Sequence, residues 1–263
     1  MNVNTYVVAK TNDEAYQRLK ENRKNKILGG GAWLKISVKD VGQLISLEAL
    51  NLDYIREKDT HIEIGAMTTL RDIEMSPLVS ELDSGILSEA ISNIMGVAIR
   101  NLATIGGSVM GKFAFSDILP VLLVMDVKLN FHHGGDVDVE TFLSNRSYQN
   151  DLLISLKINK HKRPGFFHNI ARTHLDFSMI NLAIIKGENM FLSVGSRPGL
   201  AKICHQTMLF LDKQNSIDDA VIESAASILL SEAELGHNLR ASKDYRETLL
   251  KTYFKRGMKK VVL

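Results

Sequence analysis

Two short glycine-centred segments constrain this chain most, because glycine there gives the backbone a freedom that other residues lack. The first segment, Gly29-Gly30-Gly31, follows a short apolar strand expected at 26–28 and precedes a helix expected from Ala32. The second segment, Thr104-Ile105-Gly106-Gly107-Ser108, carries a hydroxyl residue on each side of its glycines. Without a Cβ, such loops can adopt positive φ and can let a ligand approach the main chain.

Each glycine segment has two interpretations. N–H groups at a turn before a helix suit a phosphate, whereas a plain tight turn is the more frequent use of such glycines. The first segment lacks the lysine and hydroxyl spacing of a P-loop and is not the spaced dinucleotide-binding fingerprint. Two such segments about 75 residues apart could hold both faces of a pyrophosphate. Spacing and composition therefore indicate a dinucleotide or flavin site in general terms.

Composition excludes several classes of protein. The net charge is only +2 and the basic residues are spread over all 263 residues, so there is no electrostatic case for a nucleic-acid partner. No apolar run approaches the ~20 residues of a membrane span, and residues 1–16 lack the pattern of a secretory signal. Cys204 is the only cysteine, so the chain cannot form an internal disulfide, a cysteine zinc site or an iron–sulfur cluster. We expect a soluble, cytoplasmic protein whose redox chemistry, if any, needs a bound cofactor.

The chain divides at a polar stretch with turn residues, 159–165, which predicts a first domain over 1–160 and a second over 165–263. A subdivision of the first domain is expected near residue 56. Beyond the break, three strands are predicted at 166–170, 180–186 and 189–194. Helices are predicted at 216–230 and 245–258, from apolar residues at three- and four-residue spacing. The fold class is therefore mixed α+β.

Five stretches carry a resemblance to a known family. Residues 27–34 resemble a pyrophosphate loop, 99–108 are close to the pattern IRN-x-x-TIGGN, and 116–120 fall where the pattern SDLxP belongs. Residues 172–176 and 240–246 resemble the patterns R-x-x-x-D and R-x-S-x-x-YR. In this order they are typical of the FAD-binding medium subunits of the xanthine dehydrogenase and carbon monoxide dehydrogenase family of molybdenum hydroxylases. The chain resembles that family over nearly its full length.

The resemblance implies a two-part FAD-binding domain of the vanillyl-alcohol-oxidase type. A C-terminal domain with a three-stranded antiparallel sheet packed with helices should follow it. Two residues that the resemblance places at the cofactor have a structural interpretation as well: Asp117 fits a helix N-cap, and Ile154 fits a plain core position equally well. Carried over position by position, the residues expected to contact FAD are Ile27, Leu28, Gly29, Gly30, Gly31, Ala32, Trp33, Leu34, Thr104, Ile105, Gly106, Gly107, Ser108, Asp117, Ile154 and His168.

Three positions depart from the family pattern. Ser108 replaces the usual asparagine, His168 replaces a common lysine, and Ile94 lies about where some relatives place an aromatic ring against the flavin. A histidine near the flavin could donate a hydrogen bond when protonated, so its charge would depend on pH near neutrality. The remaining histidines suggest no catalytic base and no metal site, since the His132-His133 pair is expected in a solvated turn.

The resemblance implies an electron-transfer subunit that performs no bond breaking on the organic substrate. A large molybdenum-cofactor subunit and a small two-iron two-sulfur subunit would be its partners, and NAD or another acceptor would receive electrons from FAD. Two alternatives stay open at this point. One is an assembly scaffold that no longer binds FAD, and the other is a stand-alone flavin oxidoreductase, for which 263 residues leave little room for a substrate cap.

Overall fold

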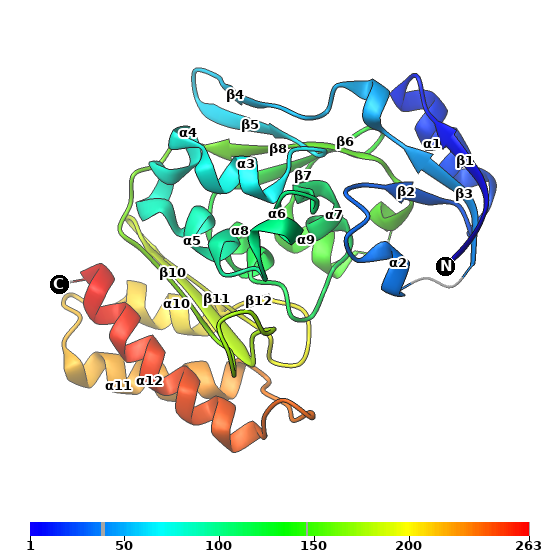
Figure 1. Ribbon diagram of the computed structural model, residues 1–263. Coiled ribbons are helices and arrows are strands. Elements are labelled where there is room, and N and C mark those ends of the chain that lie inside the picture. The colour runs from blue at the N-terminus through cyan, green and yellow to red at the C-terminus, as the bar shows by residue number, and fades with distance from the viewer. Residues whose placement is uncertain (38–39, 146, 263) are drawn as a thin grey trace. The chain divides into compact units, whose positions relative to one another are not determined.

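The computed structural model describes residues 1–37, 40–145 and 147–262 and confirms the mixed α+β class (Figure 1). The chain forms two compact units. Unit 1 consists of Met1–Ile73, Gly96–Gly111 and Val127–Asn159, and unit 2 consists of Glu74–Met95, Lys112–Asp126 and Lys160–Leu263. Each unit is thus assembled from segments that are distant in the sequence. The predicted division near 160 and the subdivision near 56 stay predictions.

Unit 1 begins with a parallel three-stranded sheet of order β1-β3-β2, formed by β1 (Asn2–Val8), β3 (Asp40–Ser46) and β2 (Lys26–Leu28). All three strands run parallel, so the chain must cross over between them, and α1 (Asn12–Glu21) is the connection from β1 to β2. Thr11 caps this helix by accepting a hydrogen bond from the Glu14 N–H at 3.1 Å. The strand β2 delivers the chain into the first glycine segment, which α2 (Leu34–Ser37) follows.

A second sheet of unit 1 is antiparallel, with five strands in the order β4-β5-β8-β6-β7. Its strands are β4 (Ile55–Glu57), β5 (His61–Gly65), β8 (Leu153–Asn159), β6 (Val127–Phe131) and β7 (Gly135–Asp138). Within β5, Ile62 and Ile64 are buried while His61 and Glu63 are partly exposed, which is the alternation of a strand with one buried face. Short helices complete the unit, namely η1 (Glu48–Leu50), α6 (Val97–Arg100), α7 (Ile105–Met110), α9 (Val139–Ser144), η3 (Ser147–Asn150) and the start of α3 (Leu70–Met75).

The sheet of unit 2 has four antiparallel strands, so the prediction of three strands is wrong. Its order is β12-β11-β10-β9, with β9 (Gly165–Ile170), β10 (Ile180–Lys186), β11 (Met190–Gly195) and β12 (Lys202–Ile203). The additional strand β12 pairs only Ile203 with Ser193 and Lys202 with Val194. Two residues cannot show a period-two pattern, so the sequence alone contains no signal for this strand.

Helices cover both faces of the unit 2 sheet. The helices α10 (His205–Asp212), α11 (Asp219–Glu232) and α12 (Lys243–Val262) enclose one apolar core with Leu182, Ile184 and Leu192 of the sheet. On the other face lie α8 (Ile118–Val124) and α5 (Ile86–Ser92), and the Ser193 hydroxyl donates to the Pro120 carbonyl at 2.6 Å. The short helices α4 (Pro77–Ser80) and η2 (Leu82–Gly85) lead into α5.

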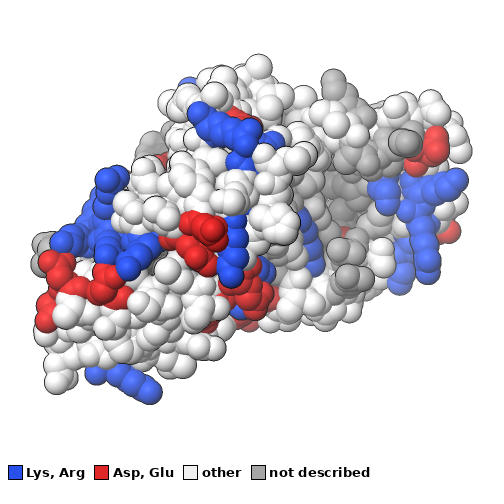
Figure 2. All heavy atoms as spheres, turned by 90° about the horizontal axis from the view of Figure 1, so that it is seen from below, with Lys and Arg blue, Asp and Glu red and all other residues white. Residues whose placement is uncertain are grey.

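Ion pairs join α11 to α12 along their exposed sides. Glu223 pairs with Lys251 and Lys255, and Asp219 pairs with Lys259 at 2.7 Å. Figure 2 shows Lys and Arg lying beside Asp and Glu on the face that it displays. Exposed pairs of this kind contribute little individually, ~0–1 kcal/mol each. Among the described residues, no helix has the length and apolar composition that crossing a membrane requires.

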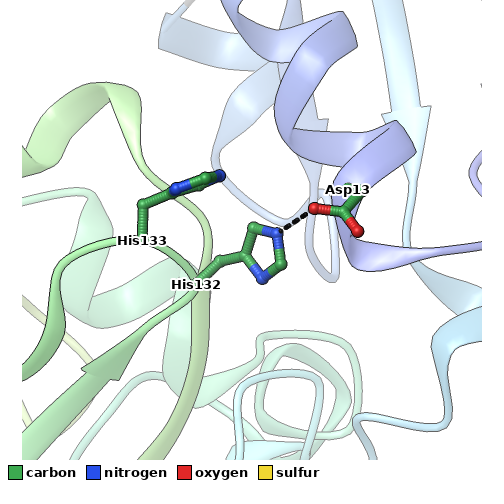
Figure 3. Close-up of side chains that lie close together, drawn as sticks. All are labelled: Asp13, His132 and His133. Atoms are coloured by element: carbon green, nitrogen blue, oxygen red, sulfur yellow. Dashed lines mark hydrogen bonds and ion pairs between the residues drawn. The ribbon is translucent and has the colours of Figure 1, made fainter.

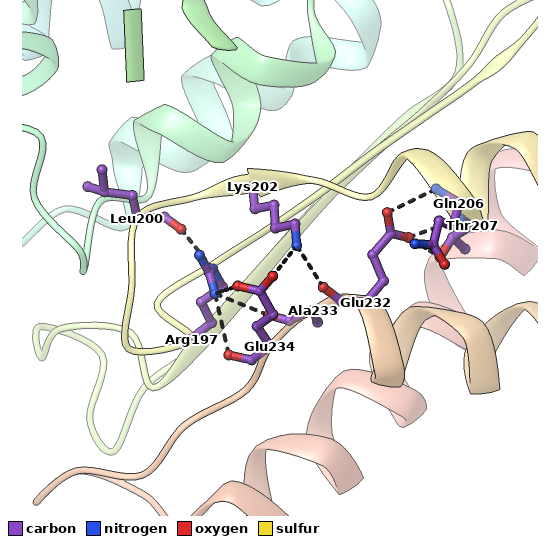
Figure 4. A network of polar contacts seen from close by, with 8 residues as sticks. All are labelled: Arg197, Leu200, Lys202, Gln206, Thr207, Glu232, Ala233 and Glu234. Atoms are coloured by element: carbon purple, nitrogen blue, oxygen red, sulfur yellow. Dashed lines mark hydrogen bonds and ion pairs between the residues drawn. The ribbon is translucent and has the colours of Figure 1, made fainter. Parts of the chain in front are cut away.

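A polar network fixes α10 to the end of α11 (Figure 4). The buried carboxylate of Glu232 accepts from the Gln206 N–H at 2.9 Å and from the Thr207 N–H at 3.0 Å. These N–H groups belong to the first turn of α10, where helix donors lack partners within the helix. Beside them, Lys202 donates to Glu234 at 2.6 Å and Arg197 donates to the same carboxylate at 3.2 Å. The network therefore caps α10 and holds β12 in place.

Candidate functional site

The two glycine loops lie directly against each other within unit 1. A Cβ added to Gly29 would lie 2.8 Å from the Thr104 hydroxyl oxygen, and one added to Gly30 would lie 1.4 Å from the Leu102 carbonyl oxygen. Both distances are too short for a real Cβ atom. The close approach of the two backbones therefore requires glycine, in addition to anything that a ligand requires.

The first loop carries backbone donors that have no acceptor among the residues described in the structure. The N–H groups of Gly30, Gly31 and Ala32 donate no hydrogen bond to any other described residue, although this segment is only partly exposed. Gly31 has φ +72°, in the left-handed region that favours glycine. Partly buried N–H groups without partners are costly unless water or a ligand accepts from them. The loop thus presents three adjacent donors suited to an anion.

The second loop uses its donors internally. In the first turn of α7, the Ile105 N–H donates to the Thr68 carbonyl at 3.0 Å and the Gly106 N–H donates to the Ala66 carbonyl at 2.9 Å. The Gly107 N–H donates to the Thr104 side chain at 3.2 Å. The hydroxyl of Ser108 also turns back, to the Thr104 carbonyl at 2.9 Å. This loop supports the first loop and leaves only a few of its own groups for a ligand.

The segment 66–70, which sequence reasoning did not select, braces the second loop and the residue before it. The carbonyls of Ala66 and Thr68 accept from the second loop, and the Leu70 N–H donates to the Ala103 carbonyl at 2.8 Å. A Cβ on Gly106 would lie 2.6 Å from the Ala66 carbonyl oxygen, so this contact is also tight. Apart from their position directly after β5, no local sequence pattern marks these residues. Their role depends on contacts between distant segments.

Asp117 lies in unit 2, in a buried polar cluster. Its carboxylate accepts from the Ser178 hydroxyl and from the Asn181 amide, both at 2.6 Å, and from Asn169 at 3.5 Å. Burial raises the pKa of the Asp117 carboxyl, although these hydrogen bonds act in the opposite direction. Asp117 occupies the N-cap position of α8 without a side-chain cap bond. The cap comes from Ser116, whose hydroxyl accepts from the Leu119 N–H at 3.1 Å.

His168 and Ile154 contact the protein around them. In unit 2, the His168 ring stacks on Tyr253 of α12, with ring centroids 4.1 Å apart. Burial, and then the nearby positive charge of Arg256, lower the pKa of His168, so the neutral imidazole is favoured near neutrality. In unit 1, Ile154 on β8 packs against an apolar cluster, and its carbonyl accepts from the Ala66 N–H at 2.9 Å. Roles toward FAD stay predictions for both residues.

The C-terminal motifs form a structural network in unit 2. Arg246 is fully buried and donates to the carbonyls of Met179, Gly236 and Ala241 at 2.6–2.8 Å. Arg240 pairs with Asp176 at 2.7 Å. Arg172 in turn donates to the carbonyls of Leu239 and Arg240 at 2.8 and 2.7 Å. These arginines therefore hold irregular backbone of unit 2 together.

Both parts of the chain match known protein families. Residues 1–158 match the family described as the FAD binding domain in molybdopterin dehydrogenase. Residues 165–261 match the family described as the C-terminal domain of the carbon monoxide dehydrogenase flavoprotein. Since the first match covers more than half of the chain, it establishes the family.

Individual relatives agree with these matches. The protein YgfM of Escherichia coli (strain K12) is 25% identical over 193 residues, covering 73% of this chain and 71% of YgfM. The xanthine dehydrogenase FAD-binding subunit of Escherichia coli O157:H7 is 28% identical over 138 residues, covering 49% of this chain and 46% of that subunit. Among solved structures, carbon monoxide dehydrogenase from Hydrogenophaga pseudoflava has a TM-score of 0.88 at 20% identity, covering 98% of this chain and 96% of that one. Quinoline 2-oxidoreductase from Pseudomonas putida 86 has a TM-score of 0.86 at 20% identity, with the same coverage.

Proposed function

Because the chain belongs to the family of FAD-binding medium subunits of molybdopterin dehydrogenases, we propose that it binds FAD as an electron-transfer subunit. The single observation that best supports binding is the set of partly buried N–H donors at Gly30, Gly31 and Ala32, for which the described residues provide no acceptor. A pyrophosphate offers several anionic oxygens to such a set. The residues therefore fit the cofactor at this loop.

The division of labour between the loops differs from the symmetric arrangement that the sequence suggested. The first loop would donate its N–H groups to the pyrophosphate, and the second would hold the first loop in position through Thr104 and the Leu102 carbonyl. Bound FAD would supply the capacity to accept and release electrons, while the chain contributes position and electrostatics. Membership of the vanillyl-alcohol-oxidase structural class is a part of this proposal, as are cofactor contacts from Asp117, Ile154 and His168.

The proposed partners are a large molybdenum-cofactor subunit and a small two-iron two-sulfur subunit. The solved structures similar to this chain include carbon monoxide dehydrogenases. The proposed electron acceptor is NAD or another acceptor. Mixing the purified chain with both partner subunits should give a stable complex on size-exclusion chromatography. Failure to associate, with FAD still bound, would favour the stand-alone flavin oxidoreductase. The cytoplasmic location stays a prediction.

Flavin binding is tested on the purified chain by its absorbance near 450 nm (roughly, for oxidised flavins) and by equilibrium titration of the flavin-free protein with FAD. Gly31→Ala places a side chain at φ +72°, which strains the first loop by ~1–2 kcal/mol. We expect this variant to bind FAD on the order of tenfold more weakly. The reason is that the three donors would no longer keep their arrangement.

Gly135→Ala is the matched control, because Gly135 has φ +63° and open space around its Cβ position in the β6–β7 hairpin. It carries the same kind of backbone strain at a place outside the two loops. We expect it to bind FAD as the wild type does. A wild-type chain that stays colourless and does not quench flavin fluorescence would refute the proposal and favour the FAD-less scaffold.

A further inference from the structure

We propose that Asp13, His132 and His133 form a binding site for one divalent transition-metal ion, such as Zn²⁺, on unit 1. One ligand atom from each residue lies within 4.8 Å of the other two (Figure 3). The sequence alone suggested no metal ligands, because Asp13 lies more than a hundred positions before the two histidines. The proposal does not depend on flavin binding.

The two histidines both reach toward α1. In a regular strand, successive side chains point to opposite faces, but His132 and His133 lie where the chain turns from β6 into β7. His132 Nε2 is 2.8 Å from the Asp13 carboxylate, and the His133 ring lies 4.0 Å from the Tyr16 ring, centroid to centroid. The expectation of a solvated pair is thus wrong for His132, whose side chain is 19% exposed.

Hydrogen bonds fix the backbone of the turn that carries the two histidines. The buried Asp151 carboxylate accepts from the His133 N–H at 3.3 Å and from the Gly134 N–H at 2.8 Å. The His132 N–H donates to the Leu152 carbonyl at 2.9 Å. A turn that is already ordered loses little further entropy when its side chains take up a ligand. The two imidazoles are therefore pre-positioned.

The available donor atoms suit a transition metal. The ring nitrogens of His133 make no hydrogen bond within the part of the chain that the structure describes, and neither does Nδ1 of His132. Imidazole nitrogen and carboxylate oxygen are ordinary Zn²⁺ ligands at ~2.0–2.2 Å. The Asp13 side chain is 79% exposed, so it can rotate to admit an ion between itself and His132. Water would complete the coordination.

Such an ion would link two sheets of unit 1. Asp13 belongs to α1, which connects strands of the parallel sheet, whereas the histidines belong to the hairpin of the five-stranded sheet. A ligand that binds only the folded arrangement stabilises it by mass action. The metal would therefore act as a clamp between these elements, and its removal should lower the temperature of unfolding.

The test is calorimetric titration of the intact chain with Zn²⁺. We expect one ion per wild-type chain. Loss of an outer-sphere partner already weakens metal sites by roughly 10–100-fold, so His133→Gln and Asp13→Asn should weaken binding at least about tenfold. The control is His61→Gln, since His61 lies on β5 beside Thr60 and outside the cluster. This variant should bind Zn²⁺ as the wild type does.

A second readout separates this site from adventitious binding to other histidines. Zn²⁺ should raise the midpoint of thermal unfolding of the wild type and of His61→Gln, and EDTA should reverse the rise. Both effects should be smaller in Asp13→Asn, a surface change that leaves the core intact, because weaker binding stabilises less at the same Zn²⁺ concentration. Equal affinity and equal stabilisation in Asp13→Asn and the wild type would overturn the proposal. So would the lack of any binding by the wild type up to about 1 mM Zn²⁺, which corresponds to ~4 kcal/mol.

Discussion

The contact between Gly30 and Leu102 permits a prediction with a magnitude taken from the structure. In Gly30→Ala, the new Cβ would start 1.4 Å from the Leu102 carbonyl oxygen, whereas ordinary contacts begin at 3.4 Å. The obstacle is backbone, which cannot rotate aside as a side chain does. Overpacking a core costs about 1–3 kcal/mol and occasionally more. We expect Gly30→Ala to reach or exceed the upper end of that range.

Separation of the loops should also remove the cofactor. The three N–H donors of the first loop keep their arrangement only while that loop rests on the second. We therefore expect Gly30→Ala to purify with little or no FAD, which the absorbance of flavin released by denaturation measures. Urea unfolding with linear extrapolation gives the accompanying loss in the free energy of unfolding.

A series of glycine variants in unit 1 provides the controls. The added Cβ would lie 2.6 Å from the nearest atom at Gly106 and 3.2 Å at Gly107, with nothing within 4 Å at Gly96. The losses of stability on substitution by alanine should therefore decrease in the order Gly30, Gly106, Gly107 and Gly96. If Gly30→Ala and Gly96→Ala unfold within about 0.5 kcal/mol of each other and retain equal FAD, the two loops do not touch as described.

Three further predictions concern unit 2. Because the folded-state pKa of Asp117 is raised, its contribution to stability is fully present below the unfolded pKa and is lost as pH rises through the folded pKa. Asp117→Asn should lack this loss, so its free energy of unfolding in urea should rise relative to that of the wild type as pH increases. Equal pH dependence of the two free energies would contradict this prediction. Arg246→Met leaves three carbonyl acceptors unsatisfied and should lower the free energy of unfolding by at least about 3 kcal/mol, whereas the exposed Lys243→Met should change it by less than about 0.5 kcal/mol. The pKa of His168, followed by NMR, should lie below the ordinary value and should rise in Arg256→Gln; no change would show that the Arg256 charge does not act on this ring.

Local patterns predicted the elements that carry the site. A strand running into three glycines is visible in the sequence, since apolar residues and glycine have local conformational preferences. The partners of the second loop were not visible, because Ala66 and Thr68 reach it only through the folding of the five-stranded sheet. The sequence therefore suggested unpaired N–H groups on both loops, whereas the described structure has such a set of N–H groups on the first loop.

The arginine motifs illustrate a different limit. The resemblance identified Arg172, Arg240 and Arg246 by their spacing, and it gave them no role. Their hydrogen bonds to main-chain carbonyls depend on where irregular loops pass, which no periodicity describes. The strand β12 was missed for a related reason, as its two residues are ordered by pairing with β11 and not by their own composition.

The sheet of unit 2 is enclosed by helices from three separate stretches of the chain, and this has a consequence for protein engineering. A fragment that begins at residue 160 would carry α10, α11 and α12 but would lack α5 and α8. One side of its sheet would then meet water, and aggregation through that bare surface would be expected. An exchange of C-terminal halves between relatives must therefore transfer residues 86–92 and 118–124 as well, or must redesign the surface that they leave.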